Sequence, residues 1–114
     1  MRIERELLRG SGPLAVLQLL SRREMYGYEL VEALDRESAG VLAMGQSTLY
    51  PLLYNLHAKG FIASHNREGP QGRVRRYYSL TKAGRRELAE QRRSWRSLTG
   101  AMAALGILDP TPSR

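Results

Sequence analysis

The chain has 114 residues, no cysteine and a formal net charge of +7 at neutral pH. This length suits one domain with a modest core, which often gains stability by pairing with a second copy. The lack of cysteine excludes disulfide frameworks and cysteine-ligated metals. No apolar run approaches the roughly 20 residues that a bilayer-spanning helix needs, and we expect no secretory signal in the charged N-terminus.

The charge is distributed unevenly along the chain. Residues 1–60 hold six arginines and one lysine against seven acids, whereas residues 61–114 hold ten arginines and one lysine against four acids. The second half therefore accounts for the whole net charge. The planar fork of arginine suits phosphates and base edges, which favours a polyanionic partner. A surface that only keeps the protein soluble is the alternative.

Glycine-rich breaks divide the first half into predicted helices. The leucine stripe that follows "GSGP" predicts a helix with Ser11 as its N-cap and Pro13 in its first turn. The amphipathic segment "IERELLR", which could form a short leading helix or an arm, precedes it. A second helix is predicted in "YELVEALDRES", where apolar residues share one side and acids lie on the other.

The third predicted helix lies in "QSTLYPLLYNL" and has the clearest pattern. Its leucines follow the spacing i, i+3, i+4, i+7, with Ser47 or Thr48 as a cap at its start and Gly60 as a C-cap. The opposite side is polar, aromatic and uncharged; it comprises Ser47, Pro51, Tyr54 and Ala58, with Tyr50 and Asn55 on its flanks. One side of this helix is therefore expected to anchor it, and the other to contact a partner.

Beyond residue 60 the sequence predicts a hairpin and one long helix. Strands in "FIASHNR" and "RVRRYYSL" flank a loop rich in glycine and proline, which gives a hairpin with a basic tip. The helix extends from its N-cap, Thr81, to about Leu105. Its apolar residues are spaced as in a heptad repeat, and we expect them to form a dimer interface: Leu88, Trp95, Leu98, Met102 and Leu105.

The predicted fold is mainly α-helical with a two-stranded β wing, a winged helix-turn-helix followed by a long dimerisation helix. The N-terminal arm and DNA-binding domain occupy residues 1–80, the dimerisation helix residues 81–108 and a frayed tail residues 109–114. In this fold the third helix enters the major groove and the wing follows the DNA backbone. The candidate base-reading residues are Gln46, Ser47, Thr48, Tyr50 and Tyr54. The candidate phosphate-binding residues of the wing are Arg67, Arg73, Arg75 and Arg76.

Several of these residues have a second interpretation. Ser47 and Thr48 could serve as helix caps alone, and Tyr50 could be half-buried against the wing. Arg76 could pair with an acid instead of a phosphate. Trp95 could form an aromatic platform for a planar effector, or simply pack in the dimer interface; saturable quenching of its fluorescence by flat aromatic cations would distinguish the two.

Three blocks of sequence resemble the PadR family of bacterial transcriptional regulators: "YGYELVEAL", "STLYPLLYNLHAKGFI" and "GRVRRYYSLTKAGRREL". The resemblance implies a cytoplasmic winged-helix repressor that dimerises through its C-terminal helix and binds a roughly palindromic operator. It also implies release by a small molecule or stress signal. One departure is residues 55–57, Asn-Leu-His where members often carry Arg-Leu-Glu, which implies weaker phosphate contact or a different sequence preference. Whether the N-terminal arm packs on its own subunit or on the partner stays open.

An enzyme is not expected from this sequence. The chain has only two histidines, its acids are scattered, and no glycine-rich phosphate loop follows a strand, so we predict no catalytic site, no metal site and no cofactor. The alternative function is a winged-helix adaptor that binds protein without specific DNA binding. Steep weakening of binding with salt would favour DNA over an adaptor role.

Overall fold

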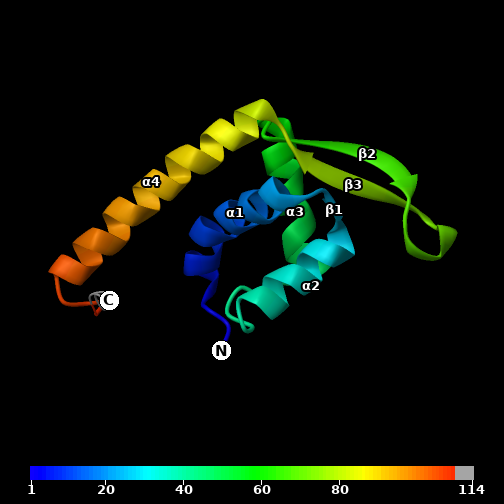
Figure 1. The fold of residues 1–114 in the computed structure, drawn as a ribbon. Helices are drawn as coiled ribbons and strands as arrows, with labels where there is room; N and C mark the ends of the chain where they lie inside the picture. The colour runs from blue at the N-terminus through cyan, green and yellow to red at the C-terminus, as the bar shows by residue number, and fades with distance from the viewer. Residues whose placement is uncertain (110–114) are drawn as a thin grey trace.

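The computed structural model describes residues 1–109, which form four α-helices and a small antiparallel sheet (Figure 1). The elements follow in the order α1 (Arg5–Arg22), β1 (Met25–Tyr26), α2 (Gly27–Glu37), α3 (Gln46–Ala58), β2 (Ile62–Glu68), β3 (Val74–Leu80) and α4 (Lys82–Ala104). A single 3₁₀ turn, Pro70–Gly72, closes the hairpin. Except for Asp109, the expected tail lies outside the described residues. No helix within residues 1–109 is long and apolar enough to cross a membrane.

The first helix is longer than the sequence predicted. Ser11 is not an N-cap, because α1 runs through it without a break and its hydroxyl donates to the carbonyl of Leu7 at 2.7 Å. A serine can satisfy a carbonyl one turn back inside a helix, so its presence did not require a helix start. Gly12 is buried, and a Cβ there would stand 3.0 Å from Cδ1 of Leu52. The glycine therefore allows α1 to approach α3 rather than ending a helix.

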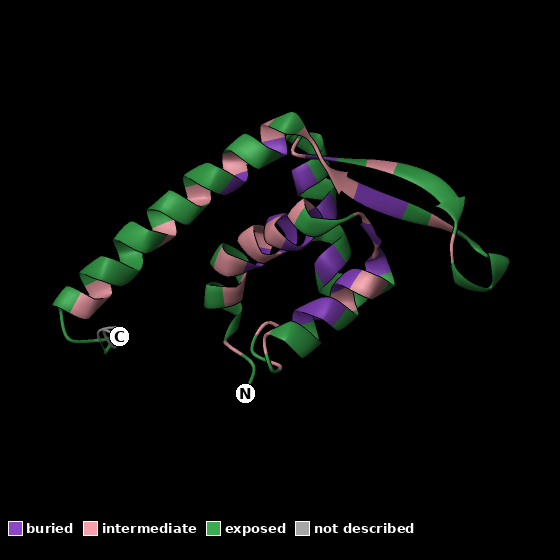
Figure 2. Ribbon diagram, viewed as in Figure 1, coloured by how far each residue is buried: buried purple, intermediate pink, exposed green. Residues whose placement is uncertain are grey.

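One hydrophobic core joins the first three helices. Its largest fully buried side chains are those of Val16, Leu17, Leu30, Leu49 and Leu53. Each large side chain of this kind contributes about 1.5–3 kcal/mol when it leaves water. The inward sides of these helices are buried in Figure 2, whereas their outer sides are exposed. The predicted leucine stripe of α3 lies inside this core, as expected from its spacing.

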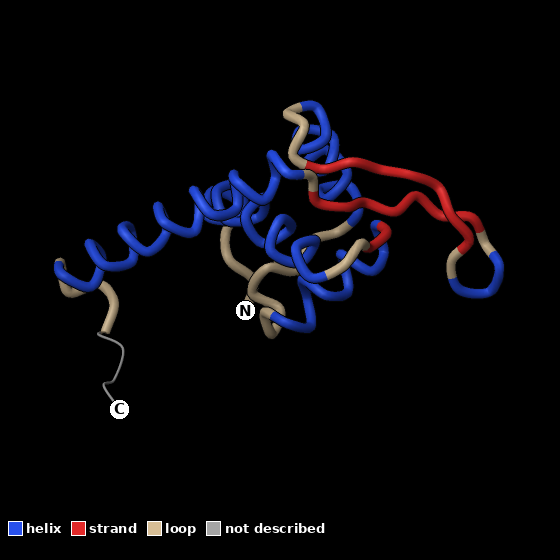
Figure 3. The backbone as a smooth tube through the Cα atoms, turned by 45° about the horizontal axis from the view of Figure 1, so that its top comes forward, coloured by secondary structure: helices blue, strands red, loops and turns tan. Residues whose placement is uncertain are grey.

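The wing is confirmed, and a third strand extends it. Strands β2 and β3 pair antiparallel from Ile62–Leu80 at the base to Glu68–Val74 near the tip, and Figure 3 shows them projecting beyond the helices. Strand β1 pairs with the other edge of β3 and gives the order β1-β3-β2. The sequence predicted a break in this stretch, so the strand was not expected. The fold is therefore mainly helical with a three-stranded sheet.

Helix α4 is tied to the end of α3 and then leaves the body of the protein (Figure 1). Thr81 is the N-cap, as predicted: its Oγ1 accepts from the backbone N–H of Gly84 at 3.0 Å and donates to the carbonyl of Gly60 at 2.7 Å. The backbone N–H of Thr81 also donates to the carbonyl of Phe61 at 3.1 Å. Gly84 and Leu88 are the buried residues of α4, so its first two turns anchor the rest.

The contact at Gly84 predicts a strong effect of adding one methyl group. A Cβ at this position would lie 2.0 Å from the carbonyl oxygen of Phe61, so Gly84→Ala must displace the start of α4. We expect a loss of about 1–3 kcal/mol in the free energy of unfolding, measured by urea denaturation at fixed protein concentration. Gly100→Ala is the matched control, because nothing lies within 4 Å of a Cβ there and an alanine stabilises a helix interior by about 1 kcal/mol. Equal stability of the two variants would contradict the contact.

Candidate nucleic-acid interface

The outward side of α3 carries polar and aromatic side chains that are open to solvent. Gln46, Ser47 and Tyr54 are exposed, and Tyr54 keeps 74% of its surface accessible. The helix starts two or three residues earlier than expected, because Gly45 is the N-cap and its carbonyl accepts from the N–H groups of residues 48 and 49. The prediction that Ser47 or Thr48 caps the helix is therefore wrong. Neither hydroxyl is used to start α3.

Tyr50 lies where α2, α3 and the wing meet. A Cβ on Gly27, the first residue of α2, would stand only 2.5 Å from the hydroxyl oxygen of Tyr50 and 3.0 Å from its Cζ. Tyr50 also lies close to Tyr78 of β3, whose pKa is raised by burial and lowered to a lesser degree by Arg76. Nevertheless, 46% of the Tyr50 surface stays accessible. Tyr50 is thus both a contact between elements and part of the exposed side of α3.

The side of the sheet that faces away from the core carries a layer of two tyrosines and two arginines. The guanidinium of Arg67 lies 3.8 Å from the ring centre of Tyr77, and that of Arg75 lies 4.7 Å from the ring centre of Tyr26. The two rings meet edge to face at 5.3 Å. We call these four residues the tyrosine–arginine layer. It leaves only 3% of Tyr77 accessible and gives the wing apolar cover that the helical core does not supply.

Arg67 is also paired with an acid. Its Nη1 lies 2.9 Å from Oε1 of Glu24, and Nε2 of His65 lies 3.6 Å from the other oxygen of the same carboxylate. The sequence analysis did not foresee this acid, because Glu24 is 43 residues before Arg67 in a segment taken for a loop. Within residues 1–109, no group of three or more acidic or histidine side chains could hold a metal ion.

The other two wing arginines are placed differently. Arg73 and Arg76 are exposed, and neither forms an ion pair with any residue between 1 and 109. Arg76 lies on the same side of the sheet as Tyr78, toward α3, because alternate residues of a strand share a side. Its charge acts on Tyr78, which Tyr50 of α3 also influences. Arg75, by contrast, has a buried Nε without a hydrogen-bond partner.

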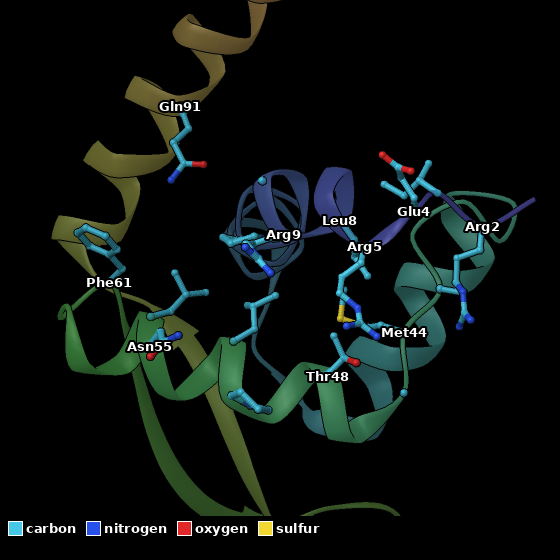
Figure 4. A pocket seen from close by; sticks show the side chains of 18 of the residues that line it. Arg2, Glu4, Arg5, Leu8, Arg9, Met44, Thr48, Asn55, Phe61 and Gln91 are labelled. Carbon is cyan, nitrogen blue, oxygen red and sulfur yellow. The ribbon is translucent and has the colours of Figure 1, made fainter.

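A groove of about 950 Å³ separates the start of α1 from α3 and α4 (Figure 4). Thr48 and Asn55 line it from α3, Arg5 and Arg9 from α1, and Gln91 from α4. Thr48 therefore lies on the flank of α3 next to this groove, away from Tyr50. The groove was not predictable from the sequence, because residues far apart in the chain form its walls.

The expected dimer interface divides into two parts. Leu88 is only 6% exposed and packs in the core of its own chain, so α1 already covers it. The apolar residues further along α4 are more accessible: Trp95 and Met102 are half-buried, whereas Leu98 and Leu105 are exposed. Trp95 and Arg92 line a small recess against α1. The surface that α4 leaves open to a partner therefore begins at Trp95.

The chain is similar to known transcriptional regulators. The family model of the PadR-like transcriptional regulators matches residues 16–90. The transcriptional regulator Rv3488 of Mycobacterium tuberculosis is 37% identical over 94 residues, which cover 82% of this chain and 84% of that protein.

Solved structures agree with this match. A Streptococcus transcriptional regulator superposes with a TM-score of 0.80 at 33% identity, covering 90% of this chain and 99% of the other. A PadR family regulator from Eggerthella lenta has a TM-score of 0.74 at 36% identity, covering 88% and 85%. The chain therefore belongs to the PadR-like family of transcriptional regulators.

Proposed function

We propose that this chain is a homodimeric repressor that binds a specific, roughly palindromic double-stranded DNA operator in the cytoplasm. The observation that carries the proposal is the exposed, uncharged side of α3 beside exposed arginines of the wing. DNA presents a complementary surface. The base edges in its major groove are neutral hydrogen-bonding groups, and the phosphates around them are negatively charged.

In this proposal α3 reads bases. Gln46 and Ser47 at its start and Tyr54 in its middle carry amide and hydroxyl groups that both donate and accept hydrogen bonds. Each base pair displays a distinct donor and acceptor pattern in the major groove, so neutral side chains of this kind can discriminate sequences. Thr48 contributes from the flank next to the groove.

Tyr50 has a double role in the proposal. Its contact with Gly27 and its place beside Tyr78 hold α3 at a set angle to α2 and the wing. Its accessible surface then contacts DNA from a fixed position, which lowers the entropy lost on binding.

The wing supplies the phosphate contacts. Arg73 and Arg76 have no acid to displace among residues 1–109 and bind first. Arg67 must exchange its contact with Glu24 for a phosphate, and Arg75 acts mainly through the shape of the tyrosine–arginine layer. The four arginines are therefore expected to contribute unequally.

A second copy completes the DNA-binding unit. Trp95, Leu98, Met102 and Leu105 form the surface on which two α4 helices pair. Pairing sets two α3 helices at a fixed distance, and a palindromic duplex is matched when they lie about 34 Å apart. A flat aromatic effector that stacks on Trp95 would change this pairing and release the repressor.

Substitutions at Tyr54 and Arg73 test the DNA interface. We expect Tyr54→Ala to weaken binding to a duplex selected from random sequences by about 1–3 kcal/mol, without changing the slope of log K against log salt, because the lost contact is neutral. Arg73→Gln should weaken binding to all sequences and reduce that slope by about 1.8, because each of the two subunits loses one phosphate contact. Tyr54→Phe separates the hydroxyl from the ring. If the unmodified protein shifts no duplex at low salt, the adaptor function replaces the repressor.

Adding a methyl group at Gly27 tests the role of Tyr50. Gly27→Ala must push the Tyr50 ring away, and we expect a loss of about 1–3 kcal/mol in stability together with weaker DNA binding. Tyr50→Phe in the same chain should recover part of the stability, which a double-mutant cycle measures. Gly10→Ala is the control, because a Cβ there meets nothing within 4 Å. Purely additive effects would show that the two residues do not interact.

Leu98 tests the dimer. Leu98→Glu places a charge in the proposed interface, so the protein should sediment as a single chain of 12.9 kDa at micromolar concentration, whereas the unmodified protein sediments at twice that mass. The single chain should stay folded, since Leu98 is 45% exposed within it. Ser97→Glu, also exposed on α4, should leave the dimer intact. A monomeric unmodified protein would refute the proposed dimer.

A further inference from the structure

Helix α4 carries a second basic surface that the wing and α3 do not account for. Five exposed basic residues form it, and we call them the α4 basic stripe: Lys82, Arg85, Arg86, Arg93 and Arg96. Among the described residues, Arg93 is the only one of the five with an acid partner, Glu90, at 2.8 Å. The stripe is therefore a concentrated positive charge that the chain itself largely leaves uncompensated.

The excess positive charge on α4 exceeds that on the hairpin. With Arg92, α4 has six basic residues against Glu87 and Glu90, which leaves +4. The hairpin, residues 62–80, has four arginines against Glu68, which leaves +3, and Glu24 offsets one of those arginines. A partner attracted by the net charge of +7 thus meets α4 as well as the wing.

The stripe lies on the side of α4 that stays open after dimerisation. With about 3.6 residues per turn, its five residues fall within one half of the helix surface, roughly opposite Leu98 and Leu105. The side of α4 that faces away from α1 is exposed along its length in Figure 2. Pairing through the apolar residues would therefore leave the stripe accessible to another molecule.

The stripe begins beside the helix that is proposed to read bases. The hydrogen bonds from Thr81 to Gly60 and Phe61 hold the first turn of α4 against the C-terminal end of α3. From there the stripe continues to Arg96, a rise of about 21 Å at 1.5 Å per residue. Phosphates next to the operator would thus meet the first residues of the stripe.

We propose that the α4 basic stripe binds the sugar-phosphate backbone of DNA that flanks the operator, on the same duplex that α3 reads. This inference rests on the proposed function. Four of the five residues are arginine, which suits phosphate oxygens, and a duplex presents one charge per about 1.7 Å of its axis. This contact requires the flanking DNA to curve toward α4, so flanks with flexible pyrimidine–purine steps should bind best.

The side chains between the basic residues argue against a membrane as the partner. Ala89, Ser97 and Gly100 are small and lie on the same side of α4. A helix that lies on a bilayer inserts large apolar residues beside its basic ones, and the stripe offers none there. Contact with a charged backbone needs only the basic groups and room for close approach.

The test compares short and long operators. A duplex selected from random sequences is trimmed to the shortest length that binds, then extended by one helical turn, about 10 base pairs, at each end. We expect the extension to increase the affinity of the unmodified protein and to steepen its salt dependence. Arg86→Gln with Arg96→Gln should remove this gain and keep the affinity for the short duplex. If each subunit of the dimer loses two phosphate contacts, the drop in affinity for the long duplex between 50 and 200 mM salt shrinks by about a hundredfold.

The matched control is Arg9→Gln with Arg36→Gln, which removes the same charge from exposed positions on α1 and α2 and should keep the gain. Equal losses in both variants would mean a general charge effect and would overturn the inference. The inference would also be overturned if the gain required a second, unlinked duplex. Binding of the stripe to vesicles of anionic lipid in place of DNA would overturn it as well. Failure to bind the short duplex at all would instead overturn the proposed function.

Discussion

Burial of the leucine side of α3 is the constraint on which the rest of the structure depends. A helix can turn only one side to a small core, and Leu49, Leu53 and Leu56 are all at most 4% exposed. Their burial fixes the opposite side, with Ser47 and Tyr54, toward solvent. The uncharged surface that the proposed function needs is thus a direct consequence of hydrophobic packing.

Close contacts at three glycines then fix α3 among its neighbours. Gly12 brings α1 against Leu52, Gly27 brings the start of α2 against Tyr50, and Gly84 brings the start of α4 against the segment that follows α3. At each of these positions a Cβ would lie 3.0 Å or less from another atom. Both ends of α3 are therefore held by backbone approach, which leaves its outward side chains exposed.

The sequence correctly predicted the secondary-structure features that depend only on neighbouring residues. The periodic leucines of α3 and the cap at Thr81 depend on neighbouring residues, and both are confirmed. Strand β1 was missed because its two residues become a strand only by pairing with β3. The break expected at Ser11 was wrong because packing of Gly12 on α3 favours a continuous helix over the local signals of glycine and proline.

The candidate site was predictable in residue type but less so in role. Heptad spacing identifies apolar residues without saying which molecule covers them, so Leu88 was assigned to a partner although its own core buries it. Residue type and position in the wing likewise assigned Arg67 and Arg75 to phosphate contact. They could not indicate that Tyr77 and Tyr26 lie under the guanidinium groups, or that Glu24 approaches from a distant segment.

Helix α4 has two parts that differ in what covers them. Its first two turns are fixed by Gly84 and Leu88, whereas the apolar residues from Trp95 onward are open to a partner. In a dimer the anchored part would follow α3 and the distal part would follow the second subunit. Trp95 lies at the boundary between them, against α1. In the proposed dimer, a ligand at this residue would act on the distance between the two α3 helices without touching either, and DNA accepts only distances that match its helical repeat.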